Sequence, residues 1–271
     1  MHERDEHARA APKIGIVLGS GAAWGAAHVG VLQTLEDAGI RISVIVGASS
    51  GALIGAGYAA GMSAGELAER LQELRWSSFA DWHPSRRWTL FDSSPLHRAL
   101  AETGRPLDIE DLDRAFGVLA FDIRKRQAVL LRSGSLATAL RASIAIPGVL
   151  PPIRVNGGIL VDGSLGDRDA VRAATDLGAD RVIAVRLHSE PGADASMTVR
   201  LLDTISGARL ARSRERASSV LQPDVLIRPD TQGMSRWSAR DVPRLIASGQ
   251  VAAQAALPMI HDMVSTFSAR D

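Results

Sequence analysis

The stretch that decides the fold is VIVGASSGALIG, residues 44–55, in which an apolar run ends in a dense group of small residues. Residues 47–51, GASSG, fit Gly-x-Ser-x-Gly, the pattern of a serine held on a sharp turn between a strand and a helix. Such a turn crowds the positions two before and two after the serine, and glycine relieves the crowding. The spacing selects Ser49 as the nucleophile, because the equivalent neighbours of Ser50 are alanines. Ser50 is then expected to open the helix and to offer its backbone N–H to an oxyanion.

A second glycine-rich turn lies one strand earlier in the chain. The apolar run KIGIVL (13–18) predicts a buried strand, and GSGAAWG (19–25) leads from it into a helical pattern. Backbone N–H groups at the start of a helix favour an anion, either a phosphate or a developing oxyanion. A close packing turn is the alternative interpretation. The candidate oxyanion donors are Gly19, Ser20, Gly21 and Ala22.

Details of this loop argue against two nucleotide-binding motifs, although a dinucleotide-binding enzyme stays a third hypothesis. A dinucleotide site would need Gly-x-Gly-x-x-Gly and an acidic residue ending the second strand, whereas the third glycine here is one place late and that strand ends at Gly47. No lysine follows the glycines, so the loop does not match the phosphate-binding loop of nucleoside triphosphatases.

A serine nucleophile needs a base, and two candidates remain open from the residues alone. Asp162 ends the apolar run ILVD and precedes a glycine, so it is either a base at the end of a strand of a parallel sheet or an ordinary turn residue. His188 follows a strand and is the best candidate for a histidine triad. The early position of the Ser49 turn argues against the usual triad fold. His28 lies on the first helix and is expected to pack or cap.

Strands alternate with helices along the chain, which predicts an α/β fold with a mostly parallel sheet covered on both faces. We expect one domain over 13–266 after a disordered tail, 1–12. The aromatic-rich region 76–94 is either a lid or a satellite hydrophobic cluster. The other expected strands are 42–46, 117–123, 127–133, two around 156–157, 181–187 and 224–229, and the expected helices are 26–39, 52–61, 64–75, 95–103, 135–145, 168–177, one within 191–222 and 240–266.

Composition narrows the function further. The chain has 271 residues, a net charge of +1 and no cysteine, which excludes disulfides, thiol catalysis and cysteine-ligated zinc. The balanced charge gives no case for nucleic acid as a partner. No run is an obvious membrane span, and the charged N-terminus does not resemble a secretory signal. We therefore expect a cytoplasmic protein, with contact at the membrane limited to its periphery.

Together the motifs resemble the patatin-like phospholipase family, especially its compact bacterial members, over about residues 13–260. Four stretches in this order carry the resemblance: LGSGAAWGAAHVGVL, VGASSGALIGAGYAAG, LRASIAIPGVLPP and LVDGS. The resemblance implies a three-layer α/β/α sandwich and a Ser–Asp dyad of Ser49 and Asp162 without histidine. It also implies an oxyanion loop around Gly19, Gly21 and Ala22, phospholipid or related acyl-ester substrates, and chemistry without metal or cofactor.

Three features depart from the family pattern. Trp24 stands where the family usually has arginine, and Asp-Gly-Ser replaces the common Asp-Gly-Gly or Asp-Gly-Ala. Asp167 and Asp169 follow the candidate base and are expected to raise its pKa or repel an anionic lipid. The alternative function is therefore a weakly active or inactive relative that binds lipid or regulates a partner.

Overall fold

The computed structural model describes residues 11–73, 107–147, 150–187, 220–236 and 238–269. The strands are β1 (Ile14–Leu18), β2 (Ile42–Ala48), β3 (Ala115–Asp122), β4 (Gln127–Leu131), β5 (Ile153–Val155), β6 (Gly158–Val161), β7 (Arg181–Val185) and β8 (Val225–Ile227). The α-helices are α1 (Ala26–Asp37), α2 (Ser50–Ala59), α3 (Ala64–Glu73), α6 (Leu136–Ser143), α7 (Ala170–Asp176) and α9 (Val242–Ala269). Short 3₁₀ turns are η1 (Ala22–Gly25), η2 (Ile109–Asp111), η3 (Gly163–Asp169) and η6 (Ala239–Asp241).

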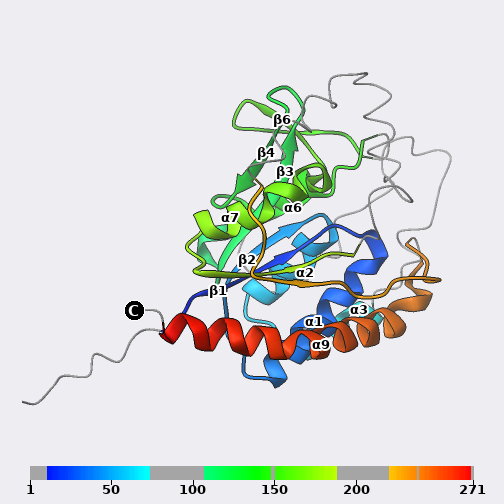
Figure 1. Ribbon diagram of the computed structural model, residues 1–271. Helices are drawn as coiled ribbons and strands as arrows, with labels where there is room; N and C mark the ends of the chain where they lie inside the picture. The colour runs from blue at the N-terminus through cyan, green and yellow to red at the C-terminus, as the bar shows by residue number, and fades with distance from the viewer. Residues whose placement is uncertain (1–10, 74–106, 148–149, 188–219, 237, 270–271) are drawn as a thin grey trace, which may run out of the picture.

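One eight-stranded sheet forms the centre of the molecule, in the order β5-β6-β3-β2-β1-β7-β8, with β4 paired to β3. The five strands β3, β2, β1, β7 and β8 run parallel to one another, and β4, β5 and β6 pair antiparallel. The expected mostly parallel sheet is therefore confirmed. Its antiparallel part is gathered at one side, at the top of Figure 1, away from α1 and α9.

Helices cover both faces of this sheet, because successive side chains of each strand point to opposite sides. On β1, Ile14, Ile16 and Leu18 pack into the larger core with α1, α2, α3 and α9, whereas Val17 joins the smaller core with α7. Gly15 lies close to α7 and the residues after it: a Cβ there would lie 3.6 Å from Cβ of Ala174 and 2.7 Å from Cβ of Ala179. The result is the expected three-layer sandwich (Figure 1).

The sequence predictions of secondary structure match the described elements closely. Ser63 and Glu66, whose spacing is typical of a capping box, form one at the start of α3: the Ser63 N–H donates to Glu66 Oε2 at 2.8 Å, and the Glu66 N–H donates to Ser63 Oγ at 3.2 Å. The tail 1–10, the aromatic region and helix within 76–103, and the segment 188–219 lie outside the described residues. Within the described part of the chain, no helix is both long and apolar enough to cross a bilayer.

The pairing of β3 places the site. Its residues 115–119 pair with β2, ending at Ala48 opposite Leu119, and its last two residues pair with β6, where Val161 lies opposite Phe121. Because β4 occupies the other edge of β3, β6 must use the edge that β2 uses lower down. Strands β2 and β6 therefore run toward each other along one edge of β3, and their ends converge beside Ala120.

Candidate active site

Ser49 occupies a strained turn between β2 and α2. Its backbone has φ of +52° and ψ of −120°, a conformation that residues with a side chain rarely adopt and that costs about 1–3 kcal/mol. A Cβ on Gly47 would lie 2.4 Å from Cα of Ala52, and a Cβ on Gly51 would lie 2.0 Å from the Leu18 carbonyl oxygen. The glycines two before and two after the serine are thus required by close backbone contacts, as the spacing predicted.

The glycine-rich loop lies beside this turn. Strands β1 and β2 are parallel with Leu18 opposite Gly47, so both strand-to-helix turns leave the same edge of the sheet. Gly25 packs against Ser50, where a Cβ would lie 2.7 Å from Cβ of the serine. The Ser50 hydroxyl is buried without a hydrogen-bond partner among the described residues, and Ser50 is the first residue of α2, as expected.

Hydrogen bonds within the loop divide the candidate oxyanion donors. The N–H of Gly19 donates to Val185 O at 3.1 Å, and the Gly19 carbonyl accepts a 2.7 Å hydrogen bond from His28 Nε2. His28 is fully buried, so it packs and holds the loop, as the sequence indicated. The N–H groups of Gly21 and Ala22 donate to no acceptor among the described residues. Ala22 has φ of +52°, a second strained backbone at this site.

A distant segment before α9 holds the same loop in place. The Trp24 indole N–H donates to Met234 O at 3.0 Å, and the Ala23 N–H donates to Arg236 O at 3.0 Å. The Arg236 guanidinium carbon lies 4.2 Å from the centroid of the Trp24 ring, a cation–π contact. A positive charge therefore lies over Trp24, although residue 24 itself carries none.

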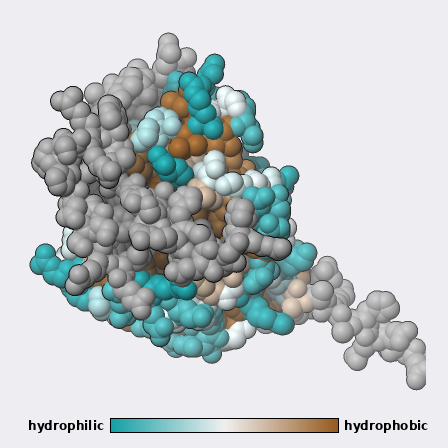
Figure 2. Space-filling model, turned by 180° about the vertical axis from the view of Figure 1, so that it is seen from behind, coloured by the Kyte–Doolittle hydropathy of each residue, from teal (hydrophilic) through white to brown (hydrophobic). Residues whose placement is uncertain are grey.

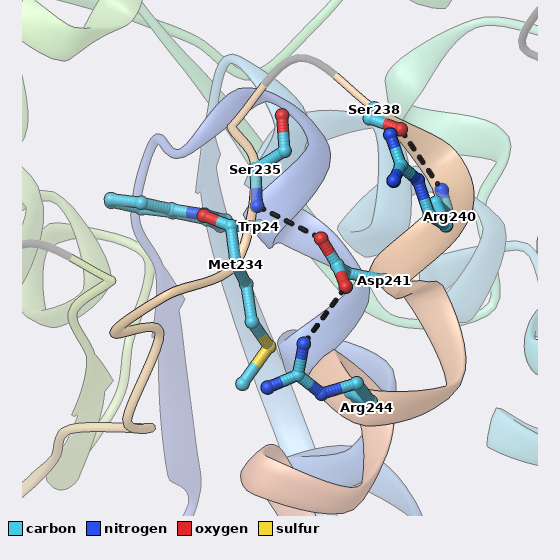
Figure 3. A network of polar contacts seen from close by, with 7 residues as sticks. All are labelled: Trp24, Met234, Ser235, Ser238, Arg240, Asp241 and Arg244. Atoms are coloured by element: carbon cyan, nitrogen blue, oxygen red, sulfur yellow. Dashed lines mark hydrogen bonds and ion pairs between the residues drawn. The ribbon is translucent and has the colours of Figure 1, made fainter.

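This segment is in turn anchored to the start of α9. The Ser235 N–H donates to Asp241 Oδ2 at 3.0 Å, and Asp241 Oδ1 accepts from Arg244 at 3.0 Å (Figure 3). The backbone hydrogen bond from Ser235, with smaller effects of Arg244 and Arg240, holds the pKa of the Asp241 carboxyl below its usual range. The loop that carries Trp24 thus rests on contacts far away in sequence.

Asp162 reaches the site from the opposite direction to Ser49. It follows β6, which is antiparallel to β3, so the expectation that it ends a strand of the parallel sheet is wrong, although its position at a strand end is right. A Cβ on the next residue, Gly163, would lie 2.2 Å from the Leu119 carbonyl oxygen. Asp162 therefore lies next to the residue of β3 that pairs with the end of β2.

The carboxyl group of Asp162 is almost fully buried, with 2% of the residue exposed. Oδ1 accepts the Ser164 N–H at 2.9 Å, and Oδ2 makes no hydrogen bond of standard geometry to a described residue. Burial raises the pKa of this carboxyl, while hydrogen bonding by Ser164 and by the Ser49 side chain opposes the rise. The Ser49 hydroxyl is thus close enough to Asp162 to stabilise its charged form. The sequence analysis attributed a raised pKa of Asp162 to Asp167 and Asp169, whereas burial is its main cause in the structure. Asp169 is exposed, and the side chain of Asp167 lies outside the described residues.

Sequence reasoning missed one residue at the centre of this arrangement. Ser143, the fully buried last residue of α6, accepts the Ser49 N–H at 2.8 Å and donates its hydroxyl to Leu119 O at 2.6 Å. Its Oγ also lies 3.0 Å from where a Cβ on Gly163 would be. Ser143 therefore joins the turns that carry Ser49 and Asp162. Its place in the quoted stretch LRASIAIPGVLPP was the only sequence signal.

The remaining candidates are less informative. His188, the alternative base, lies outside the described residues. Among the residues that the structure describes, no three His, Asp or Glu side chains gather as ligands for a metal ion.

The fold and site define an α/β protein with a strained serine turn, a glycine-rich loop and a buried carboxyl at one sheet edge. Residues 16–175 match the family model described as "Patatin-like phospholipase". The chain therefore belongs to the patatin-like phospholipase family, a family of lipid hydrolases.

Individual relatives agree with this assignment. The "Uncharacterized NTE family protein Rv1063c" of Mycobacterium tuberculosis is 33% identical over 205 residues, covering 69% of this chain and 53% of that protein. "Lysophospholipase nte1" of Emericella nidulans is 33% identical over 183 residues, covering 65% of this chain and 12% of that protein. The chain thus spans about half, or much less, of the length of these relatives. Among solved structures, VipD from Legionella pneumophila has the same fold, with a TM-score of 0.52 and 12% identity over 92% of this chain and 67% of that chain.

Proposed function

We propose that the protein is a serine acyl-ester hydrolase of the phospholipase A, lysophospholipase or lipid-esterase type, with Ser49 as nucleophile and Asp162 as base. One observation carries the proposal: β2 and β6 meet end to end along β3 and bring the strained serine next to a buried carboxyl. Membership of a family of lipid hydrolases and the name of the fungal relative support the substrate class.

The proposed reaction begins with proton transfer from the Ser49 hydroxyl to Asp162 as the oxygen attacks the ester carbonyl. A carboxyl with a raised pKa is a better base for this step than an ordinary aspartate, because efficiency rises as the pKa approaches the working pH. The tetrahedral oxyanion then accepts hydrogen bonds from the N–H groups of Gly21 and Ala22. Each such donor contributes a factor of about 10²–10³ in comparable sites.

Collapse of this intermediate releases the alcohol, which takes the proton back from Asp162, and leaves the acyl group on Ser49. Water, deprotonated by Asp162, attacks the acyl-enzyme, and the fatty acid departs as Ser49 recovers its proton. The Gly19 N–H has no part in this scheme because Val185 holds it. Ser50 contributes at most its backbone N–H, since its hydroxyl is buried against Gly25.

Hydrolysis of p-nitrophenyl esters of short and long chains, and of lysophospholipids, tests the proposal. Ser49→Ala should reduce turnover to the background rate, and Asp162→Asn should lower kcat by a factor of about 10² or more. A fluorophosphonate probe should label the wild type and the Ser50→Ala variant but not Ser49→Ala. If the wild type turns over every ester no faster than both variants, the hydrolase proposal is refuted, and lipid binding becomes the favoured function. Loss of activity in His188→Ala with retention in Asp162→Asn would replace the dyad by a triad.

A further inference from the structure

Two turns project together beyond the sheet edge that carries the site. Strand β3 continues past Ala120 into the turn 123–126, which leads to β4, and β6 begins beside it after the turn 156–157. The Ile123 N–H donates to Ile159 O at 3.0 Å and ties the two hairpins together. At about 3.3 Å per residue, the first turn begins about 10 Å beyond Ala120, on the side of the sheet edge where Ser49 and Asp162 meet.

Five exposed side chains on these two hairpins form what we call the basic tip: Ile123, Arg124, Lys125 and Arg126 at the first turn, and Arg154 on β5. The four cations form no ion pair within the described part of the chain. Ile123 is 38% exposed among them, one of few large apolar side chains so exposed in the described residues. In the space-filling view, hydrophilic and hydrophobic surfaces lie next to each other in the upper part of the molecule, where Figure 1 places these hairpins (Figure 2).

The turn itself is held firmly and keeps its acid away from the surface. Asp122 is buried, and its Oδ1 accepts the N–H groups of Arg124 and Lys125 at 2.8 and 3.1 Å. Its carbonyl accepts the Arg126 N–H at 2.7 Å, and Arg126 adopts φ of +56° to close the turn. The single acid of this turn is therefore used inside, while three consecutive cations point to solvent from a fixed backbone.

A run of charges on an exposed turn is most often an ordinary solvated surface. Three observations favour a ligand here: a cation from a second hairpin joins the run, an apolar side chain lies exposed within it, and the tip rises from the edge that carries the site. Clustered cations with an inserting apolar side chain are the combination that binds anionic lipid surfaces, where each cation near the surface strengthens binding about fivefold.

We propose that the basic tip docks this protein onto anionic lipid bilayers, with Ile123 entering the interface and the cations contacting phosphate head groups. The orientation places the sheet edge of Ser49 and Asp162 toward the bilayer. The consequence for catalysis rests on the proposed function; the docking itself does not, since it involves none of the site residues.

Sedimentation with sucrose-loaded vesicles tests the docking, using the full chain carrying Ser49→Ala so that no lipid is consumed. The protein should bind vesicles of phosphatidylcholine with 30% phosphatidylglycerol and should not bind pure phosphatidylcholine, and added salt should weaken the binding. The triple variant Arg124→Gln, Lys125→Gln, Arg126→Gln should bind the anionic vesicles about 100-fold more weakly, by the fivefold factor per cation. Ile123→Ser keeps every charge and should also weaken binding.

A matched control removes three exposed cations elsewhere, by Arg41→Gln, Arg70→Gln and Arg240→Gln, and has the same net charge as the first triple variant. It should bind the anionic vesicles within about threefold of the parent. Equal losses in the two triple variants would mean that net charge alone acts, and the proposal would be wrong. The proposal would also be overturned if the protein did not bind anionic vesicles. It would equally be overturned if the tip variant lost binding of duplex DNA but kept its binding of vesicles.

Activity separates this proposal from the proposed function. With Ser49 restored, the tip triple variant should hydrolyse a soluble short-chain p-nitrophenyl ester at the wild-type rate and should lose turnover of lipid in anionic vesicles by about the factor lost in binding. If no ester is cleaved by the wild type, the hydrolase assignment fails while the vesicle result still stands or falls on its own.

Discussion

Replacement of Ser143 by alanine tests whether the site depends on the bridge between its two turns. The substitution removes the acceptor of the Ser49 N–H and the donor to Leu119 O, both in a fully buried position. A buried polar group left without its partner costs about 1–3 kcal/mol, and the strained φ of Ser49 loses one of the contacts that maintain it. We expect the free energy of unfolding to fall by about 1–3 kcal/mol, with a Tm lower by about 2–4 °C per kcal/mol.

Kinetics of the same variant test the positioning directly. Because the proposed mechanism requires the Ser49 hydroxyl within reach of Asp162, Ser143→Ala should lower kcat about tenfold or more with little change in KM. The rate of fluorophosphonate labelling should fall in parallel. Ser265→Ala is the control, since that exposed hydroxyl donates only to Asp262 O on the last turns of α9. If the Ser143→Ala variant keeps the kcat and Tm of the wild type, the idea that Ser143 holds Ser49 in position is refuted.

Three further predictions follow from single contacts. Gly51→Ala places a Cβ 2.0 Å from a backbone oxygen of β1 and should prevent soluble expression, whereas Gly65→Ala, exposed on α3, should be tolerated. Burial raises the pKa of Asp162 above the ordinary 3.8, so the stability that the protonated carboxyl contributes is present at low pH and is lost as the pH rises through the raised pKa. Urea unfolding should therefore show Asp162→Asn gaining stability relative to the wild type from pH 4 to 8. The kcat/KM of the wild type should rise over the same range. A constant difference across pH would contradict this. Trp24→Phe removes the hydrogen bond to Met234 O and should lower the unfolding free energy by about 1 kcal/mol, measured by chemical denaturation; an unchanged midpoint would refute it.

Local sequence was sufficient for the elements and for the strained turn at Ser49. Apolar runs, glycine positions and the capping box predicted the order of strands and helices, because each depends on residues close in the chain. The choice of Ser49 over Ser50 also needed only local spacing. Its physical reason is that a Cβ at Gly47 or Gly51 would clash with neighbouring backbone. The residues alone left Asp162 and His188 open as the base, and the family resemblance favoured Asp162.

Tertiary structure decided how the distant parts meet. The sequence placed Asp162 at the end of a strand but did not reveal that β6 is antiparallel and meets β2 head on, because strand direction depends on pairing between segments far apart. Ser143 was invisible as a bridge, since its partners lie 94 and 24 residues away. The guanidinium over Trp24 comes from Arg236, more than two hundred residues further along. Glycine spacing thus determined the strained turn from sequence alone, whereas the carboxyl, the bridge and the cation beside it were set by contacts that only the folded chain creates.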